Sequence, residues 1–392
     1  MEAFYKTHKY LLTHTEAPVR RNLMDEIDWD ERLIGIKGTR GVGKTTFLIQ
    51  YAQEYYPDDL SCLYINMNNF YFQGRSLVDF AQDFVHQGGK TLLVDQVFKI
   101  PHWSQQLRDC YEKFPKLKIV FTGSSVMRLK EENPLLNGIV KSYNLRGFSF
   151  REFLNLQTGN NYPCYSLNDI LKNHESIARR ILPTVKPLDY FQDYLHHGFY
   201  PFFLEKRNFA ENLLKTMNMM MEVDILLIQQ IELKYLSKIK KLLYLLAVSG
   251  PSTPNVSALA EEIEMSRATV MNYIKYLADA RLINLVYKEG DDFPRKPARV
   301  LLHNPNLAYS IYPVQANEED VLEMFLVNAL WKDHTVHKGS AIYPFLIDGK
   351  LPFRICTNGM PPKANPNAYY CMHHKDLGRN NQIPLWLFGF LY

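Results

Sequence analysis

The sequence predicts an α/β fold that starts with a parallel sheet, and two observations support this. Short apolar runs recur in the first third of the chain, each bounded by Gly, Asp, Asn or Lys, and stretches with helical apolar spacing separate them. Strands that helices cover on both faces have unbroken apolar runs of this kind, and their alternation with helices indicates a parallel sheet. The expected strands are Leu33–Ile36, Cys62–Ile65, Thr91–Val94 and Ile119–Phe121, and the helices between them include Thr46–Tyr55 and Trp103–Phe114.

Composition limits the remaining choices. The 392 residues carry a net charge of +4, with 46% hydrophobic and 22% charged residues, which excludes disordered, collagen-like and coiled-coil chains. The length indicates two or three domains. Five scattered cysteines without a CxxC pair favour a reducing compartment. No signal peptide is apparent, and apolar runs such as Leu242–Val248 are too short to cross a bilayer. We therefore expect a cytoplasmic protein without a membrane partner.

The chain divides into four expected domains, which are 1–148, 149–250, 251–312 and 313–392. The second is mostly helical, and residues 194–201 look like a break between its helices. The third has the order of a winged helix-turn-helix, with a helix at Ser257–Ile263 and a second helix capped by Ser266. Its strands would be Leu282–Tyr287 and Ala298–His303. The fourth begins with a helix and ends in an apolar tail, Ile383–Tyr392, that we expect to be buried.

The sharpest motif follows the first expected strand. Residues 38–45 read GTRGVGKT, which fits the phosphate-binding pattern G-x-x-x-x-G-K-[ST] in its required position between a strand and a helix. Its glycines let backbone N–H groups turn toward phosphate oxygens, and the helix N-terminus adds partial positive charge. Lys44 would reach the β- and γ-phosphates, and the Thr45 hydroxyl would ligate Mg²⁺. The residues expected around the nucleotide are Gly38, Thr39, Arg40, Gly41, Val42, Gly43, Lys44, Thr45 and Thr46.

The expected second half of this site is Asp95, at the end of the third strand, where it would hold Mg²⁺ through a water. The other interpretation is an ordinary strand-ending Asp. No Asn-Lys-x-Asp or Thr-Lys-x-Asp segment of guanine-specific proteins is apparent, so ATP is favoured over GTP.

Gln96 follows where many ATPases of this class have Glu. An amide cannot accept the proton of the attacking water, and general-base help is typically worth about 10²–10⁴-fold in rate. We expect Mg–ATP binding with slow hydrolysis, although Gln orients water in small GTPases and could do so here. Thr122 or Ser124 on the next strand could sense the γ-phosphate, or simply cap that strand.

With these residues placed, the chain resembles AAA-plus-superfamily ATPases of bacteria and archaea that carry a C-terminal restriction-endonuclease-like domain. The resemblance spans nearly the whole chain. It implies an ATPase core, a helical lid or extension, a winged helix and a degenerate α+β nuclease-like domain. The segments that carry it are GTRGVGKTT at Gly38, LLVDQ at Leu92, FTGSS at Phe121, SFREFL at Ser149, residues 194–201, and SALAEEIEMSRATVMNYIKYLADARLI at Ser257.

Two further departures from this family concern charge. Relatives often have Gly-Arg after the sensor strand, where the Arg can act on a neighbouring subunit's phosphates, but here Ile139 follows Gly138 and Lys141 cannot be assigned the role. A working nuclease needs an Asp and then Glu-x-Lys on adjacent strands. Here only Glu323, on the preceding helix, and Asp348 remain as acidic candidates. The strand after Asp348 has Arg354 and Cys356 instead, so we expect this domain to be inactive.

The sequence contains two weaker patterns. Residues 266–299 hold seven Lys or Arg and four Asp or Glu, and Arg267 and Lys275 would share an exposed helix face. That face could read DNA or contact protein. Separately, the segment 371–374, Cys-Met-His-His, with Cys356 upstream matches no standard tetrahedral metal pattern, so we expect a surface hairpin there.

The sequence thus predicts an ATP-binding protein, either a slow ATPase or an ATP-gated switch, with Lys44, Gln96 and Thr122 as its catalytic residues. Thr45 and Asp95 would hold Mg²⁺. The alternative is a DNA-binding regulator that uses Arg267 and Lys275, with ATP as a structural or allosteric ligand. Possible partners are DNA, another protein or further copies of the chain. A Mg²⁺-dependent nuclease is disfavoured.

Overall fold

A computed structural model describes residues 1–57, 59–127, 133–205, 208–226, 230–312, 316–359 and 365–392. The chain forms two compact units, residues 1–146 and 147–392. Within the described residues, none of the helices has the length and apolar character that crossing a membrane would require.

Unit 1, residues 1–146, contains the predicted parallel sheet. All of its strand pairs are parallel, in the order β2-β3-β4-β1-β5. The first four strands lie where the apolar runs predicted them, and they are almost completely buried. The fifth was not predicted. The strands are β1 (Leu33–Gly38), β2 (Cys62–Asn66), β3 (Thr91–Asp95), β4 (Lys118–Ser124) and β5 (Lys141–Asn144).

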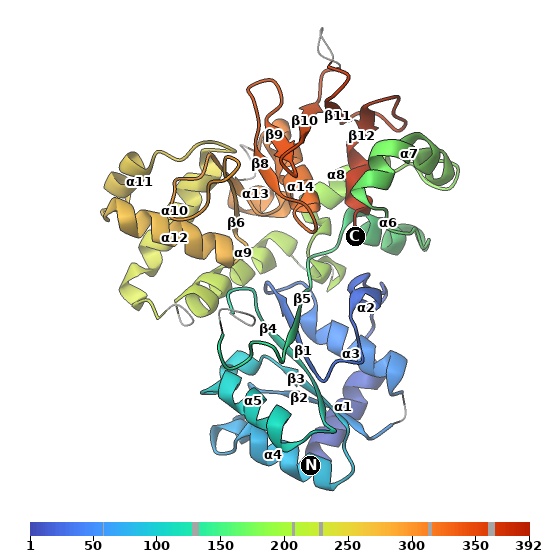
Figure 1. The fold of residues 1–392 in the computed structure, drawn as a ribbon, viewed down its shortest axis with the longest axis vertical. Coiled ribbons are helices and arrows are strands. Elements are labelled where there is room, and N and C mark those ends of the chain that lie inside the picture. Colours follow the sequence, from blue (N-terminus) through green and yellow to red (C-terminus); the bar gives the residue numbers. More distant parts are fainter. Residues whose placement is uncertain (58, 128–132, 206–207, 227–229, 313–315, 360–364) are drawn as a thin grey trace. The chain divides into compact units, whose positions relative to one another are not determined.

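Helices cover both faces of this sheet, which explains why its strands are apolar on both sides. Figure 1 shows α1 and α3 on one side and α4 and α5 on the other. The helix α3 contacts β1, β2, β3 and β4, and it begins directly at the end of the phosphate-binding motif. The helices of unit 1 are α1 (Glu2–His14), α2 (Leu23–Glu26), α3 (Lys44–Tyr55), α4 (Leu77–His86) and α5 (Trp103–Lys113).

Unit 2, residues 147–392, holds the remaining helices and two further sheets. The helices are α6 (Phe150–Thr158), α7 (Leu167–Ile181), α8 (Leu188–Asp193), α9 (Phe209–Met219), α10 (Leu236–Val248), α11 (Val256–Glu262), α12 (Arg267–Asp279), α13 (Pro305–Ile311) and α14 (Glu318–Leu330). The strands are β6 (Ile283–Val286), β7 (Arg299–Leu302), β8 (Val336–Lys338), β9 (Phe345–Ile347), β10 (Leu351–Cys356), β11 (Tyr369–Met372) and β12 (Gln382–Pro384). The three domains expected after residue 148 share this one compact unit, and the boundaries between them stay predictions.

Residues 251–312 have the element order that the sequence predicted. The helices α11 and α12 are followed by the antiparallel pair β6–β7, and the Ser266 hydroxyl caps α12 by accepting a hydrogen bond from the Thr269 N–H. The predicted break at 194–201 is instead a π-helical continuation of α8 through Gly198, followed by a 3₁₀ turn. The Asn306 side chain bonds the backbone there, donating to the carbonyls of Tyr194 and Leu195.

The C-terminal sheet is mixed, with the order β12-β11-β10-β9-β8. The pairs β10–β11 and β11–β12 are parallel, and β8–β9 and β9–β10 are antiparallel. The expected surface hairpin at 371–374 is therefore wrong. Cys371 and Met372 lie on β11, a central and buried strand, because apolar neighbours on both sides of the sheet enclose it, and only residues 373–374 form a turn.

The apolar tail is buried, as predicted. It forms β12 and a 3₁₀ helix at 385–390 that pack against the helices at the start of unit 2. Arg151 Nε donates to the Tyr392 carbonyl at 3.0 Å, and the Tyr165 N–H donates to the Phe390 carbonyl at 2.9 Å. In Figure 1, α6 and α7, drawn in green, lie beside β12, drawn in red. The start of the helical region and the end of the chain thus form a single core.

Candidate functional site: the phosphate loop and the end of β3

The phosphate-binding motif forms a tight loop between β1 and α3. Gly41 (φ 80°) and Gly43 (φ 89°) adopt left-handed conformations that residues with a Cβ rarely adopt. The Val42 side chain between them is buried and anchors the loop to the core. The first helical hydrogen bond of α3 joins the Phe47 N–H to the Gly43 carbonyl at 2.9 Å. The N–H groups of residues 44–46 precede it, where an anion can accept from them.

Lys44 lies across the loop. Its ammonium donates to the carbonyl oxygens of Gly38 and Thr39, at 2.8 and 2.7 Å. The ammonium therefore lies against the backbone of the loop, beside any phosphate group that the loop would bind. Lys44 and the N–H groups at the start of α3 thus lie at the same loop, an arrangement that suits an anion such as a phosphate.

Asp95 is the polar centre of the site. Its carboxylate is buried at the end of β3 and accepts hydrogen bonds from four side chains on three other elements. The Thr45 hydroxyl donates to Oδ2 at 2.8 Å, which joins the helix start to the end of β3. The other donors are the Tyr64 hydroxyl at 2.9 Å, Asn66 Nδ2 at 3.4 Å and the Thr122 hydroxyl.

Gln96 follows Asp95 with a left-handed backbone (φ 58°). Its N–H donates to the Thr122 hydroxyl at 2.9 Å, so Thr122 holds both Asp95 and Gln96. Two residues further along β4, Ser124 lies opposite Gly38 in the parallel register. The Ser124 hydroxyl is buried without a hydrogen-bond partner. Of the two residues suggested as phosphate sensors, Thr122 is committed to this network and Ser124 is not.

Sequence reasoning missed three residues of this site. Tyr64 and Asn66 lie on β2, the neighbour of β3, and Asn66 pairs with Asp95 in register. Burial, then the nearby Asp95 carboxylate, raises the pKa of the Tyr64 phenol well above its usual value, which keeps it a hydrogen-bond donor. The polar end of β2 was a usable signal. No sequence signal marked Arg21. It is buried and donates hydrogen bonds to the carbonyls of Val42 (3.0 Å) and Arg146 (2.6 Å), and the first of these bonds supports the phosphate loop.

The residues present fit a magnesium ion. A threonine hydroxyl and an aspartate carboxylate are oxygen ligands of the kind that Mg²⁺ prefers, and the two are already in contact. Thr45 is also exposed, so waters and phosphate oxygens could complete the coordination. Within the described residues, this pairing lies at the mouth of the loop that Lys44 spans.

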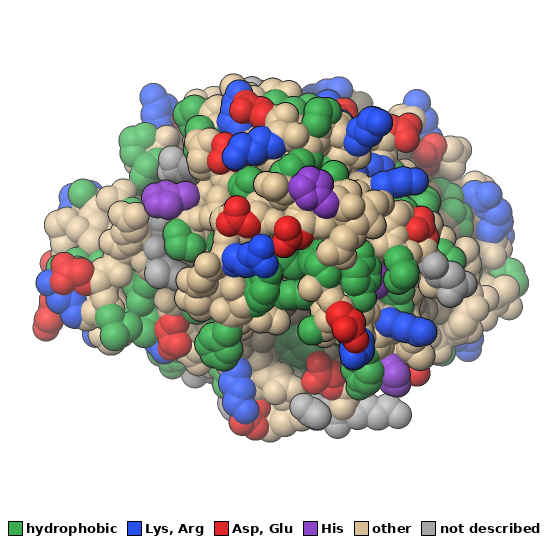
Figure 2. All heavy atoms as spheres, turned by 90° about the horizontal axis from the view of Figure 1, so that it is seen from below, with side chains coloured by type: hydrophobic (Ala, Val, Ile, Leu, Met, Phe, Trp, Pro, Cys, Tyr) green, Lys and Arg blue, Asp and Glu red, His purple; other side chains and the backbone are tan. Residues whose placement is uncertain are grey.

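The two residues predicted to contact DNA differ in their surroundings. Arg267 is the first residue of α12 and is exposed, whereas the Lys275 ammonium is paired with Asp279 at 2.8 Å. In Figure 2, Lys and Arg side chains are interspersed with Asp and Glu on the face shown, rather than gathered by sign. This agrees with the small net charge of +4.

The acidic residues expected from a nuclease each have a partner within unit 2. Asp348 binds His334 at 2.8 Å and the Thr335 N–H at 3.0 Å. Glu323 on α14 is paired with Arg299 on β7, at 2.6 Å. Neither joins a group of three metal-ligating side chains in the part of the chain that the structure describes.

Two segments of the chain match protein-family models. Residues 30–154 match a family model described as an AAA domain, and residues 188–297 match a domain of unknown function (DUF8612). The chain therefore carries an AAA domain of the P-loop class, and such a domain implies ATP binding. The matched AAA segment contains the loop, Lys44, Thr45, Asp95 and Gln96.

Two curated proteins of Methanocaldococcus jannaschii are similar in sequence. The uncharacterized protein MJ1637 is 26% identical over 66% of this chain and 58% of its own length. The uncharacterized protein MJ1544 is 25% identical over 64% of this chain and 55% of its own length. The chain thus spans little more than half the length of these relatives.

Solved structures with some similarity include the Aeropyrum pernix Orc1 protein in complex with DNA, at 12% identity over 82% of this chain and 92% of that chain, with a TM-score of 0.29. AMPPCP-bound DnaA from Aquifex aeolicus has 13% identity over 71% of this chain and 87% of that chain, with a TM-score of 0.26. At these scores the matches support no argument about this chain beyond those its own fold and site provide.

Proposed function

We propose that this protein binds Mg–ATP in unit 1 and acts as a slow ATPase or an ATP-gated switch. The observation that carries the proposal is the 2.8 Å hydrogen bond between Thr45 and Asp95 at the mouth of the loop that Lys44 spans. It supports the proposal because the two oxygen side chains that would hold Mg²⁺ lie beside the loop and the Lys44 ammonium that would hold the phosphates. The AAA domain supports ATP as the nucleotide, and the contacts of Lys44, Thr45 and Asp95 support the details of its binding.

Different groups of the loop would contact different parts of Mg–ATP. The backbone of Gly38–Thr46 would hold the phosphate oxygens, and Lys44 would exchange its two carbonyl acceptors for the β- and γ-phosphates. Thr45 and Asp95 would hold Mg²⁺, which neutralises phosphate charge when it is bound. Ser124 is proposed as the γ-phosphate sensor, because its buried hydroxyl is the one polar group on this edge of β4 with an unused hydrogen bond, among the residues described.

Slow hydrolysis is proposed from Gln96. Its backbone is fixed by Thr122, so its amide can orient a water, but it offers no base for the water's proton. Thr122 is proposed as a positioning residue that sets the Asp95 carboxylate and Gln96. Lys141 is paired with Glu31 at 3.4 Å, so we assign it no role at the phosphates. Assembly into a homo-oligomer and a cytoplasmic location remain proposals from the sequence.

The experiment is ATP binding with the full chain and with Lys44→Ala. Fluorescent or calorimetric titration with Mg–ATP is expected to show saturable binding that falls at least tenfold in the variant, because the charge on the β- and γ-phosphates loses its partner. Lys113→Ala, in the last turn of α5, removes a lysine outside the motif and should leave affinity unchanged. Equal affinity in wild type and Lys44→Ala would disprove the site.

A second candidate function is DNA binding by residues 251–312, which we propose as a winged helix-turn-helix. The exposed Arg267 at the start of α12 supports it, while the Lys275–Asp279 pair weakens the contribution of the second residue. Arg267→Ala should lower duplex affinity, and binding should weaken steeply with salt. If no duplex binding occurs at low salt, this candidate is excluded. We also propose that residues 313–392 are nuclease-like in fold and inactive, because Glu323 and Asp348 have other partners.

A further inference from the structure

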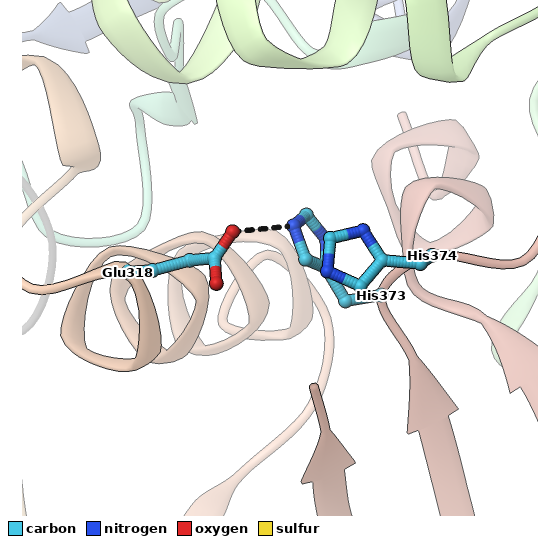
Figure 3. A group of neighbouring side chains, drawn as sticks. All are labelled: Glu318, His373 and His374. Atoms are coloured by element: carbon cyan, nitrogen blue, oxygen red, sulfur yellow. Dashed lines mark hydrogen bonds and ion pairs between the residues drawn. The ribbon is translucent and has the colours of Figure 1, made fainter. Parts of the chain in front are cut away.

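Three side chains in unit 2 gather their metal-ligating atoms outside the nucleotide site. Glu318 is the first residue of α14, and His373 and His374 form the turn that follows β11 (Figure 3). One ligand atom of each lies within 4.8 Å of the others. Over the described ranges, this is the one group of three His, Cys, Asp or Glu side chains that meets so closely.

The turn explains how two successive histidines can face the same point. Successive residues of a strand point to opposite faces, but β11 ends at Met372, and the turn brings both imidazoles together with ring centroids 4.1 Å apart. His373 Nε2 lies 3.1 Å from Glu318 Oε1. The two supporting elements are well packed, since α14 is largely buried and β11 lies between β12 and β10 in its sheet.

The distance between His373 and Glu318 is that of a hydrogen bond, and it also suits two ligands of one ion. Two ligands of a tetrahedral ion with bonds of about 2.0–2.1 Å lie about 3.3 Å apart, close to the observed 3.1 Å between His373 and Glu318. One ligand atom of His374 lies within 4.8 Å of the other two, and His374 and Glu318 are both exposed. His373 is buried, with its side chain 7% exposed. Its Nε2 contacts Glu318, and its Nδ1 has no hydrogen-bond partner among the described residues.

We propose that Glu318, His373 and His374 form a zinc site. Two imidazoles and one carboxylate are a ligand set typical of Zn²⁺, whereas Ca²⁺ and Mg²⁺ prefer oxygen ligands alone. Three protein ligands leave a fourth position for water on the exposed side. The ion would link the first turn of α14 to the end of β11, through Glu318 and His373, which are 55 positions apart in the sequence.

The chain contains its own controls for this proposal. His196 and His197 form a second His-His pair, with Nδ1 atoms 3.3 Å apart, and His334 pairs with Asp348 at 2.8 Å. Neither pair is joined by a third ligand atom within the described residues. A site that depends on three converging ligands should therefore form at 318/373/374 and at neither control.

The experiment uses the full chain, stripped of metal with a chelator and titrated with Co²⁺ and then with Zn²⁺. We expect one equivalent of Co²⁺ with the visible absorption of a tetrahedral ion, displaced by Zn²⁺, and a higher Tm with Zn²⁺ than with chelator. His374→Ala and Glu318→Gln should each weaken binding more than about tenfold, since even the loss of an outer-shell partner costs 10–100-fold. Glu318→Gln keeps a hydrogen-bond acceptor for His373, so folding should persist.

His196→Ala and His334→Ala should bind zinc as wild type does. The proposal is overturned if wild type gives no Co²⁺ absorption and no Zn²⁺-dependent Tm shift. It is equally overturned if binding survives both His374→Ala and Glu318→Gln, or is abolished by His196→Ala.

Discussion

At the scale of single residues, Gln96 is the position that sets the expected rate of hydrolysis. Gln96→Glu is nearly isosteric and keeps the left-handed backbone that the N–H bond to Thr122 stabilises. It supplies a carboxylate where a general base would act, so turnover should rise by about tenfold or more, with ATP affinity unchanged. Steady-state phosphate release measures this.

Gln105→Glu is the matched control, because Gln105 is an exposed glutamine on α5. It should leave turnover unchanged. A Gln96→Glu variant with wild-type or lower turnover would show that the amide already orients water adequately, or that the base lies elsewhere.

Arg21 should stabilise unit 1, since it supports the phosphate loop through a hydrogen bond to the Val42 carbonyl. Arg21→Ala removes charged hydrogen bonds to the buried carbonyls of Val42 and Arg146. It should lower the free energy of unfolding of unit 1 by about 3–6 kcal/mol, at about 1.5–3 kcal/mol for each of the two hydrogen bonds from a charged group. It should also weaken ATP binding, because the loop loses support. Urea unfolding and ATP titration measure the two effects.

Arg20→Ala is the adjacent control. Arg20 is paired with Asp25 and Glu54, but it is 43% exposed, so its loss should cost about 1 kcal/mol or less. Equal destabilisation by the two variants would contradict the role assigned to Arg21.

At the scale of elements, Glu323 joins α14 to β7 through Arg299. Burial raises the pKa of the Glu323 carboxyl to about 7, although Arg299 opposes this and Asp320 and Glu319 reinforce it. The folded state therefore holds the proton at pH values where the unfolded chain has released it. Stability should fall as pH rises from about 4.5 to about 7, by up to about 3 kcal/mol at about 1.4 kcal/mol per pKa unit.

The measurement is the pH dependence of unfolding in wild type and Glu323→Gln, which cannot titrate. The difference between the two profiles should lie in this window and level off above pH 7. Parallel profiles through the window would contradict the raised pKa of Glu323.

The elements also show what the sequence could predict. The first four strands of unit 1 are predictable because burial on both faces leaves unbroken apolar runs. The fifth, Lys141–Asn144, is polar and partly exposed, so no apolar pattern marks it. Gly38–Thr45 and Asp95 follow from local motifs, whereas Arg21 and Tyr64 reach the site through contacts that no local spacing encodes. The hairpin expected at 371–374 was wrong because the partners of β11 are parallel strands, which sequence proximity does not indicate.

At the scale of the whole molecule, two compact units predict two unfolding transitions. Each unit holds two of the four tryptophans, Trp29 and Trp103 in unit 1, and Trp331 and Trp386 in unit 2. Urea unfolding of Trp29→Phe/Trp103→Phe and of Trp331→Phe/Trp386→Phe should report the units separately. Mg–ATP at 100 times its Kd should stabilise unit 1 by about 2.7 kcal/mol.

Lys44→Ala should lose this ATP-dependent shift and keep both transitions. A single transition shared by both tryptophan pairs would contradict the division into units.

The joining of α6 and α7 to the last residues has a consequence for biosynthesis. Arg151 and His174 bind partners that follow them by 241 and 206 residues. At a translation rate of about 5–20 residues per second, these helices would leave the ribosome about 10–50 s before their partners do. Their apolar faces would be exposed to solvent during that time, so the nascent chain should depend on chaperones. Slow translation of the final third of the chain should therefore increase aggregation.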